Sequence, residues 1–342
     1  FWVEYTDETF RKLYDSTDAE RYRQIRLENW HQSDTRYAPF VEFAMVPYAG
    51  RYFTITEHGY RSNGGPVTDP AAPGAKVFVF GGSTTLGIGV GDDETIPAYL
   101  ERALRAAGHD SVRVYNFGAV SYYSTQERIA LERLLTAGVK PDVAVFVDGL
   151  NDFYYCGVPD VSAWNERLIQ ITRARSRMPL TLELAHRSNV VQLARHLAGD
   201  KSVMVREWGN FCGAESDVDA VVHRLDTNRR ILDATGERLG FKTLFVQQPV
   251  PTFAYDNRKR PFPVREEMLG YHANSARGYP RMDQARAEGR LWERGLLWLA
   301  ELEPENGANA YIDTVHYAPR FNQAIGERIA RSIVEGGMLP TR

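Results

Sequence analysis

The sequence has few cysteines, and they are not arranged to bind a metal. Its 342 residues include two cysteines, Cys156 and Cys212, which lie far apart and form no C-x-x-C motif. This excludes a disulfide-rich scaffold and a zinc ribbon. Two possibilities remain open: one long-range disulfide in an oxidising compartment, or two unpaired thiols. His186 and His196 are too far apart for a pair of ligands on one helix, so we expect no metal and no cofactor.

The sequence also lacks an excess of positive charge. The formal net charge is -3, and no segment contains a long run of Lys and Arg. Binding to a nucleic-acid backbone depends on many positive side chains that neutralise phosphates. We therefore expect no nucleic-acid partner.

Long apolar runs are missing as well. No stretch of 18 apolar residues occurs, and no charged start is followed by the apolar run of a signal peptide. The chain nevertheless begins at Phe1 rather than Met. Phe1, Trp2 and Val3 suit the aromatic margin of a membrane-anchoring helix, which leaves open whether such a helix precedes them.

From residue 76 onward the sequence alternates short apolar runs with patterns of helical spacing. The runs predict strands at 76–80, 112–115, 142–147, 243–247 and 309–312, and the helical patterns cover 96–107, 124–135, 218–238 and 282–302. Strands that alternate with helices favour right-handed crossovers and a parallel sheet covered on both faces. The predicted fold class is therefore α/β with a mostly parallel five-stranded sheet.

The N-terminal part has a different character. Residues 1–75 are rich in charged and aromatic side chains and end in a turn-rich linker at 63–75. We interpret them as a preamble that packs on a main domain of residues 76–342. Within that domain the long segments at about 153–216 and 252–305 are predicted to be insertions that cover the site and set specificity.

The loop after the first predicted strand contains the first candidate for chemistry. Ligands bind beyond the carboxyl ends of parallel strands, and this loop runs from Gly81 through Ser83 to Gly87. A phosphate-binding P-loop would need a lysine after Gly87. A dinucleotide site would need an acidic residue where the chain has Tyr115 and Asn116. The remaining alternatives for Ser83 are a nucleophile and a helix cap.

Other strand ends supply partners for a nucleophilic serine. His316 lies three residues after Asp313, so one loop contains both a base and a carboxylate to orient it. The side-chain amide of Asn151 and the backbone N–H groups of Gly118 and Ser83 are candidate donors to an oxyanion. Each motif alone is weak. Their occurrence in order, each after a predicted strand, favours nucleophilic catalysis.

These motifs resemble a known family. Gly-Gly-Ser at Ser83, Asn-x-Gly at Gly118, Gly-x-Asn-Asp at Asn151 and Asp-x-x-His at Asp313 and His316 are similar to blocks I, II, III and V of the SGNH (GDSL-like) hydrolases. The resemblance implies a three-layer, flavodoxin-like fold with Ser83 as nucleophile, His316 as base and Asp313 as its partner. It also implies an oxyanion hole made by Ser83, Gly118 and Asn151. One departure is Gly82, which stands where the Gly-Asp-Ser variant has aspartate.

Several further residues are candidates for substrate binding. Arg61 and Asn63 precede the first strand and resemble an element of anchored bacterial members; they contact substrate or hold the preamble in place. Asp152 follows Asn151 and is a candidate to bind substrate or to support its loop. The aromatic residues after blocks II and III, which line a cleft or pack in the core, are Tyr122, Tyr123, Phe153 and Tyr154.

The resemblance implies a serine esterase that acts on short O-acyl groups, most simply O-acetyl, on a small-molecule or glycan substrate. Alternatives are an O-acyltransferase on a glycan, a lysophospholipase or thioesterase, and a carbohydrate-binding module without activity. Anchored bacterial relatives also lead us to expect an extracytoplasmic location, periplasmic or secreted. The oligomeric state does not follow from the sequence.

Overall fold

A computed structural model describes residues 5–32, 34–156, 212–262, 264, 266–304 and 309–340. Several parts of the sequence predictions lie outside these residues: Phe1, Trp2 and Val3, the two histidines His186 and His196, and most of the predicted 153–216 insertion. Among the helices that are described, none is long and apolar enough to cross a bilayer.

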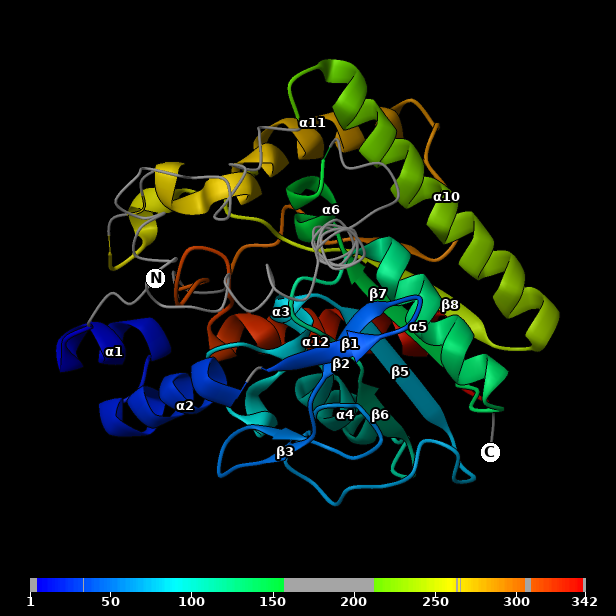
Figure 1. Ribbon diagram of the computed structural model, residues 1–342, viewed down its shortest axis with the longest axis horizontal. Helices are drawn as coiled ribbons and strands as arrows, with labels where there is room; N and C mark the ends of the chain where they lie inside the picture. Colours follow the sequence, from blue (N-terminus) through cyan, green and yellow to red (C-terminus); the bar gives the residue numbers. More distant parts are fainter. Residues whose placement is uncertain are drawn as a thin grey trace, which may run out of the picture.

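The centre of the fold is a five-stranded sheet in the order β6-β5-β7-β8-β9 (Figure 1). All its strand pairs are parallel. The strands are β5 (Lys76–Gly81), β6 (Arg113–Asn116), β7 (Val143–Asp148), β8 (Lys242–Gln247) and β9 (Leu296–Trp298). The predicted fold class is therefore confirmed.

Helices cover both faces of the sheet because successive side chains of a strand point to opposite faces. Val77 and Val79 of β5 pack with helices α4 (Ile96–Ala106) and α12 (Pro319–Glu335). Phe78 and Phe80 pack on the other face, with α5 (Ser124–Thr136) and α10 (Glu215–Leu239). The result is the three-layer architecture that the resemblance implies (Figure 1).

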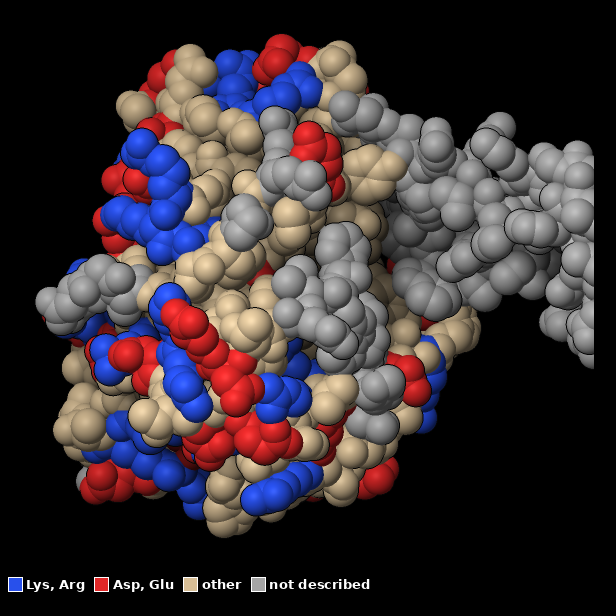
Figure 2. Space-filling view, turned by 90° about the vertical axis from the view of Figure 1, so that its left-hand side faces the viewer, with Lys and Arg blue, Asp and Glu red and all other residues tan. Residues whose placement is uncertain are grey.

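The N-terminal segment packs against the segment that follows β5. It contains α1 (Asp7–Tyr14), α2 (Ala19–Gln32) and the short strands β1 (Thr35–Ala38), β2 (Glu42–Met45), β3 (Tyr48–Ala49) and β4 (Thr54–Ile55). The hydroxyl of Tyr14 donates to the carbonyl of Gly89, whose N–H donates to the side chain of Asn29. On the face shown in Figure 2, positive and negative side chains are interspersed. Within α1, Lys12 forms an ion pair with Glu8.

Two sequence predictions near the C-terminus are wrong. The helix expected over 282–302 is α11 (Ser275–Ala287) followed by a loop and β9. Gly289 and Gly295 have φ angles of 65° and 68°, which interrupt a helix, and the leucines beyond them supply β9 instead. Residues 309–312 form no strand of the sheet. Tyr311 instead forms an isolated antiparallel β-bridge with Tyr317. The fifth strand is β9.

The remaining short elements surround the carboxyl edge of the sheet. They are α3 (Ser83–Leu86), η1 (Asp92–Glu94), α6 (Leu150–Tyr154), η3 (Asn257–Lys259) and η4 (Glu266–Asn274). Helix α6, which follows β7, contacts both η4 and α11. The 252–287 segment therefore packs against the start of the chain after β7.

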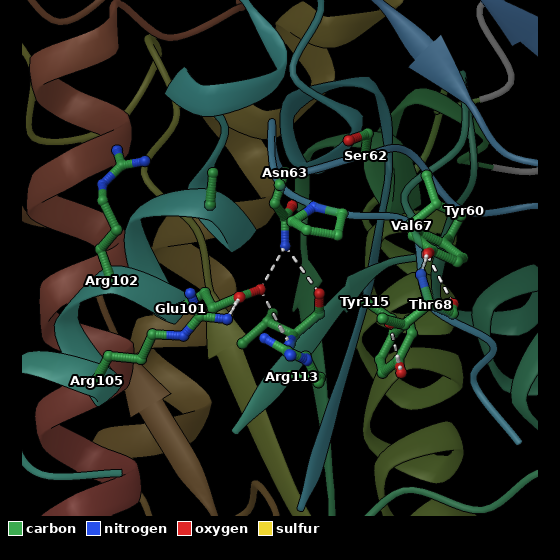
Figure 3. A pocket seen from close by; sticks show the side chains of 14 residues that line it. Tyr60, Ser62, Asn63, Val67, Thr68, Glu101, Arg102, Arg105, Arg113 and Tyr115 are labelled. Carbon is green, nitrogen blue, oxygen red and sulfur yellow. Dashed lines mark hydrogen bonds and ion pairs between the residues drawn. The ribbon is translucent and has the colours of Figure 1, made fainter. Parts of the chain in front are cut away.

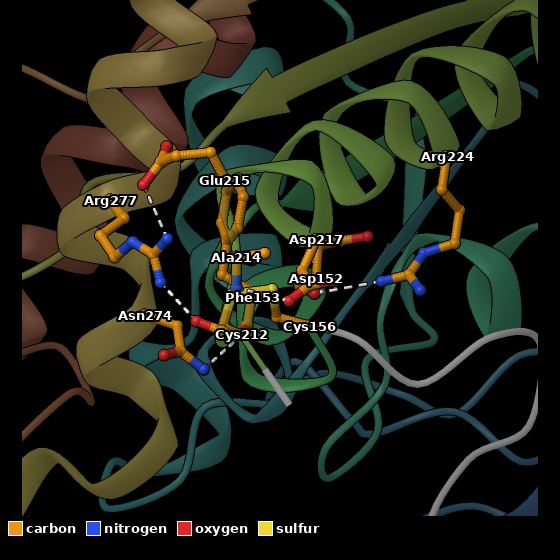
Figure 4. The surroundings of a disulfide bond; sticks show 10 residues. All are labelled: Asp152, Phe153, Cys156, Cys212, Ala214, Glu215, Asp217, Arg224, Asn274 and Arg277. Atoms are coloured by element: carbon orange, nitrogen blue, oxygen red, sulfur yellow. Dashed lines mark hydrogen bonds and ion pairs between the residues drawn. A yellow bond between two sulfur atoms is a disulfide. The ribbon is translucent and has the colours of Figure 1, made fainter. Parts of the chain in front are cut away.

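Cys156 and Cys212 form a disulfide with a Cα–Cα distance of 5.2 Å (Figure 4). This resolves the question that the sequence leaves open. Hydrogen bonds tie both sides of the bond to α11: Arg277 donates to the carbonyl of Cys212, and Asn274 donates to the carbonyl of Phe153. The disulfide thus joins the end of α6 to the start of α10 beside the candidate site.

Replacing both cysteines with alanine is expected to lower the free energy of unfolding by about 2–4 kcal/mol, because the unfolded chain is then free of a long closed loop. Denaturant unfolding with and without a reducing agent measures this. The wild-type protein should lose a similar amount of stability when reduced, whereas the double variant should not respond to the reductant. Equal stability of the oxidised protein and the variant would contradict the prediction.

Candidate active site

Ser83 lies at the turn between β5 and α3. β5 ends at Gly81, and Gly82 takes the N-cap position of α3 in an extended conformation, so Ser83 is the first residue of the helix and not its cap. A Cβ on Gly81 would lie 2.1 Å from the hydroxyl oxygen of Thr85, so this sharp turn requires a glycine. The hydroxyl of Ser83 is thereby presented at the carboxyl edge of the sheet.

His316 reaches Ser83 from the other end of the chain. Its Nε2 lies 2.9 Å from the Ser83 Oγ, and its Nδ1 lies 2.8 Å from Oδ2 of Asp313. A carboxylate only accepts hydrogen bonds, so the Nδ1 must carry the proton and the Nε2 is left to accept from the serine hydroxyl. The structure therefore brings together the three side chains that the sequence places in blocks I and V.

The loop that contains His316 also fixes the charge of Asp313. Burial alone would raise the pKa of Asp313, but the positive ring of His316 and the hydrogen bonds to this carboxylate hold the pKa well below its ordinary value. Backbone N–H groups of Val315 and His316 donate to Oδ1 at 2.9 and 2.8 Å. Asp313 is therefore ionised whenever His316 is able to act as a base.

Asn151 lies next to the serine turn. Its Nδ2 donates to the carbonyl of Tyr122 at 2.7 Å, which uses one of its two N–H bonds. A Cβ on Gly82 would lie 2.3 Å from this Nδ2 and 3.1 Å from the Tyr122 carbonyl oxygen. The close packing explains why glycine, and not aspartate, precedes Ser83 in this chain.

Gly118 does not take the place that the sequence predicts. Its N–H donates to the side-chain oxygen of Asn116 at 3.0 Å, so it is not directed at an oxyanion. A Cβ on Gly118 would lie 2.4 Å from the backbone nitrogen of Leu86, so this glycine allows the loop to pack on α3. Ser121, three residues later, has a left-handed φ of 59°, which is strained for a serine. Its N–H has no hydrogen-bond partner among the described residues.

A model of the GDSL-like lipase/acylhydrolase family matches residues 79–266, more than half of the chain. The chain belongs to this family. The resemblance inferred from the motif blocks is thus confirmed, and the protein is an SGNH-type ester hydrolase. None of the curated proteins matches it.

The fold of this hydrolase is similar to solved structures of low sequence identity. An esterase from Pseudoalteromonas shares 11% identity at a TM-score of 0.39, with 76% of this chain and 97% of that chain covered. An acetyl xylan esterase shares 14% identity at a TM-score of 0.39, with 75% and 99% covered. A lipase/acylhydrolase from Enterococcus faecalis shares 15% identity at a TM-score of 0.38, with 78% and 98% covered.

Arg61 holds the hydrolase together instead of contacting substrate. It is fully buried and pairs with Asp92 at 2.9 Å. Its guanidinium also donates to the carbonyls of Leu86, Gly87 and Val90, at the end of the nucleophile helix α3 and in the loop after it. The sequence suggested substrate contact as one alternative, and the structure supports the other, because no part of this side chain is accessible.

Asn63 lies away from the catalytic side chains. It donates to Glu101 and to the carbonyl of Val114 beside the edge strand β6, in a small pocket of about 100 Å³ (Figure 3). This pocket does not include Ser83 or His316. Of the two alternatives for Asn63, its contacts therefore support the structural role.

Most of the aromatic candidates pack inside the hydrolase. Tyr122 and Tyr123 are 5% exposed and Phe153 is fully buried. Asp152 is also buried and accepts a hydrogen bond from the Ser124 hydroxyl at 2.6 Å, so it supports the Asn151 loop. Tyr154 alone of these residues lines a cavity beside His316.

Sequence reasoning missed a buried polar network beneath the Asn151 loop. Burial, and then the negative charge of neighbouring carboxylates, raises the pKa of both Glu127 and Asp148. Arg229 is 1% exposed and donates a hydrogen bond to the side-chain oxygen of Gln247 at 2.8 Å. The positive charge of its guanidinium partly offsets the rise in the pKa of Asp148. The sequence around Glu127 does not indicate that its side chain faces Asp148.

The raised pKa values predict how stability changes with pH. Above a pH of about 4, the carboxyl groups of Glu127 and Asp148 keep protons in the folded protein that they have released in the unfolded chain. The free energy of unfolding should therefore fall as the pH rises from about 4 towards the raised pKa values of these two groups. Each retained proton contributes up to about 1.4 kcal/mol per pH unit. Denaturation curves of the wild type and of the Glu127→Gln, Asp148→Asn double variant measure the difference. An identical pH dependence in the two proteins would contradict this assignment.

Proposed function

We propose that this hydrolase removes short O-acyl groups, most simply O-acetyl groups, from a carbohydrate through an acyl-enzyme on Ser83. The observation that carries the catalytic part is the continuous chain of hydrogen bonds from Ser83 through His316 to Asp313. A serine hydroxyl becomes an effective nucleophile when a base oriented in this way removes its proton.

The first half of the reaction forms the acyl-enzyme. The Ser83 oxygen bonds to the ester carbonyl carbon as its proton passes to the Nε2 of His316. The carbon–oxygen bond to the alcohol then breaks, and the alcohol oxygen takes that proton from His316. In the second half, water gives a proton to the same Nε2 and attacks the acyl carbon, which releases the carboxylic acid and restores the serine hydroxyl.

Three donors are proposed to stabilise the oxyanion that forms in both halves. One is the N–H of Ser83, which lies at the N-terminus of α3 and has no partner among the described residues. A second is the N–H of Asn151 that the carbonyl of Tyr122 does not use. The third is the N–H of Ser121, whose left-handed backbone replaces the role predicted for Gly118. Donors fixed in advance contribute most when charge develops on the substrate.

Two observations support a carbohydrate ester as the substrate and a location outside the cytoplasm. The disulfide between Cys156 and Cys212 is typical of exported proteins, because cytosolic thiols are kept reduced. The cavity beside His316 has aromatic walls from Tyr5, Tyr154 and Tyr271, and such rings pack well against the apolar faces of sugars. The same walls also contain aliphatic side chains, which favours a lipid-directed hydrolase as the second candidate.

A fluorophosphonate probe tests the nucleophile directly. Incubation of the protein with the probe, followed by mass spectrometry of its peptides, should place a single adduct on Ser83. Prior denaturation should abolish labelling, since reactivity depends on the assembled His316. An unlabelled native protein, or an adduct on another residue, would show that the mechanism is wrong.

A substrate panel tests the rest of the proposal. Acetylated glycans should release acetate, and short p-nitrophenyl esters should be cleaved faster than long ones. A steep preference for long chains would replace the carbohydrate proposal with a lysophospholipase or thioesterase. Faster transfer of the acyl group to a sugar than to water would identify an acyltransferase, and glycan binding without turnover would identify a binding module.

A further inference from the structure

A cavity of about 600 Å³ is lined in part by His316 and Asp313 and extends away from Ser83. It is enclosed between the N-terminal helix α2 and the segment η4. Its walls include Tyr5, Arg26, Phe262, Leu269, Tyr271 and the loop from Asp313 to His316. Its volume falls in the range of pockets that hold a small ligand.

The position of the cavity identifies which half of an ester it would hold. The alcohol oxygen must lie within hydrogen-bond distance of the His316 Nε2, which protonates it as the ester breaks. Among the described residues, His316 and Asp313 line the cavity, whereas Ser83, Asn151 and Tyr122 do not. The cavity is therefore on the side of the leaving alcohol and not on the side of the oxyanion.

Arg26 gives this alcohol site a charge. The other two arginines of α2 each pair with two carboxylates: Arg21 with Asp93 and Glu94, and Arg23 with Asp7 and Glu20. Arg26 has no ion pair in the described part of the chain, and its Nη1 has no hydrogen-bond partner there.

The surroundings of Arg26 hold the guanidinium in place without neutralising it. It lies 4.5 Å from the centre of the Tyr5 ring, and the Tyr5 hydroxyl donates to the carbonyl of Ile312 at 3.2 Å. The negative charge of Asp313 is among the causes that raise the pKa of Arg26. That carboxylate, however, already accepts hydrogen bonds from His316 and from two backbone N–H groups. A fixed, partly buried guanidinium without a counter-ion is well suited to bind an anionic group of a ligand.

We propose that the cavity binds the alcohol half of the ester and that this alcohol carries a carboxylate or phosphate group, which pairs with Arg26. The inference rests on the proposed esterase function and narrows its substrate to an acylated acidic sugar or sugar phosphate. The aromatic walls contact the sugar ring, and Arg26 selects the anion.

Three acetyl esters built on one sugar test this site: methyl glucoside, the corresponding glucuronoside with a carboxylate, and the 6-phosphate. Acetate release gives kcat/KM for each. The wild type should favour at least one anionic ester over the neutral one by about tenfold or more, mainly through KM. The relative rates of the two anionic esters distinguish carboxylate from phosphate.

Arg26→Met should reduce this preference towards unity, and Arg26→Lys should retain part of it. The readout is a ratio of two substrates on the same preparation, so partial misfolding of a variant does not affect it. Arg23→Met is the matched control, with the same change three residues earlier on α2, and it should keep the wild-type ratio.

Equal kcat/KM for neutral and anionic esters in the wild type overturns the anion site and leaves the proposed function intact. A ratio that is the same in Arg26→Met as in the wild type also overturns it, because Arg26 would then act only through Asp313. If no sugar acetate is cleaved while p-nitrophenyl acetate is, the carbohydrate proposal fails and the anion site fails with it.

Discussion

Replacing Ser83 with alanine is expected to lower kcat for ester hydrolysis by about 10⁴- to 10⁶-fold. The variant loses the oxygen that attacks the carbonyl, whereas the oxyanion donors and the cavity remain. Alanine suits the first turn of α3, and Gly82 rather than Ser83 caps that helix, so the fold should be unchanged. Initial rates with p-nitrophenyl acetate measure the loss, and circular dichroism with a thermal melt checks the fold.

Ser332→Ala is a suitable control for this experiment, because Ser332 lies near the C-terminal end of α12 and supplies no group to the proposed mechanism. It should retain the wild-type rate. A Ser83→Ala protein that hydrolyses esters within tenfold of the wild-type rate would remove Ser83 from the mechanism.

Replacing Asp313 with asparagine is expected to lower kcat by about 10⁴-fold. The carboxylate accepts from the Nδ1 of His316 at 2.8 Å, and this bond keeps the Nε2 free to accept the serine proton. An asparagine amide turned towards the ring would donate instead, which stabilises the wrong tautomer. The same rate assay measures the effect, and Asp283→Asn on the surface of α11 is the matched control.

The pH profile of the wild type provides a second check on Asp313. Its pKa is held well below the ordinary value, so the carboxylate stays charged over the working range and contributes no acid limb near pH 4. An Asp313→Asn variant that keeps more than a tenth of the activity would show that another group orients His316.

Much of the fold followed from local patterns in the sequence. The apolar run Lys76–Phe80 became β5, because a strand buried on both faces needs apolar residues throughout. Ser83, His316 and Asp313 were identifiable because each lies directly after a predicted edge of the sheet or in one short loop. The parallel topology accounts for the position of Ser83 after β5, whereas the loop of Asp313 and His316 reaches it without a preceding strand of the sheet.

The errors arose where long-range contacts decide the outcome. The leucines at 296–302 have helical spacing, yet Leu296 pairs with Phe245 in a strand, and only the sheet edge that β8 offers explains this. The motif around Gly118 does not reveal that the side chain of Asn116 takes its N–H. Tyr122 looked like a cleft residue, but its hydroxyl donates to the carbonyl of Phe43 in the N-terminal segment.

The cavity could not be predicted from the sequence for the same reason. Arg26 and His316 are separated by almost the whole chain, and nothing in the α2 sequence distinguishes Arg26 from Arg21 or Arg23. Helix α2 packs against the loop at Gly89, and of its three arginines Arg26 is the one that lines the cavity.

The disulfide has a consequence for how this hydrolase can be varied. Cys156 and Cys212 have Cα atoms 5.2 Å apart, so two points that lie 56 residues apart in the sequence meet at a single covalent junction. The domain therefore places almost no geometric demand on the length of what lies between. That junction is a natural point for grafting, because a short turn, a tag or a foreign module could connect Cys156 to Cys212 without stretching the chain on either side.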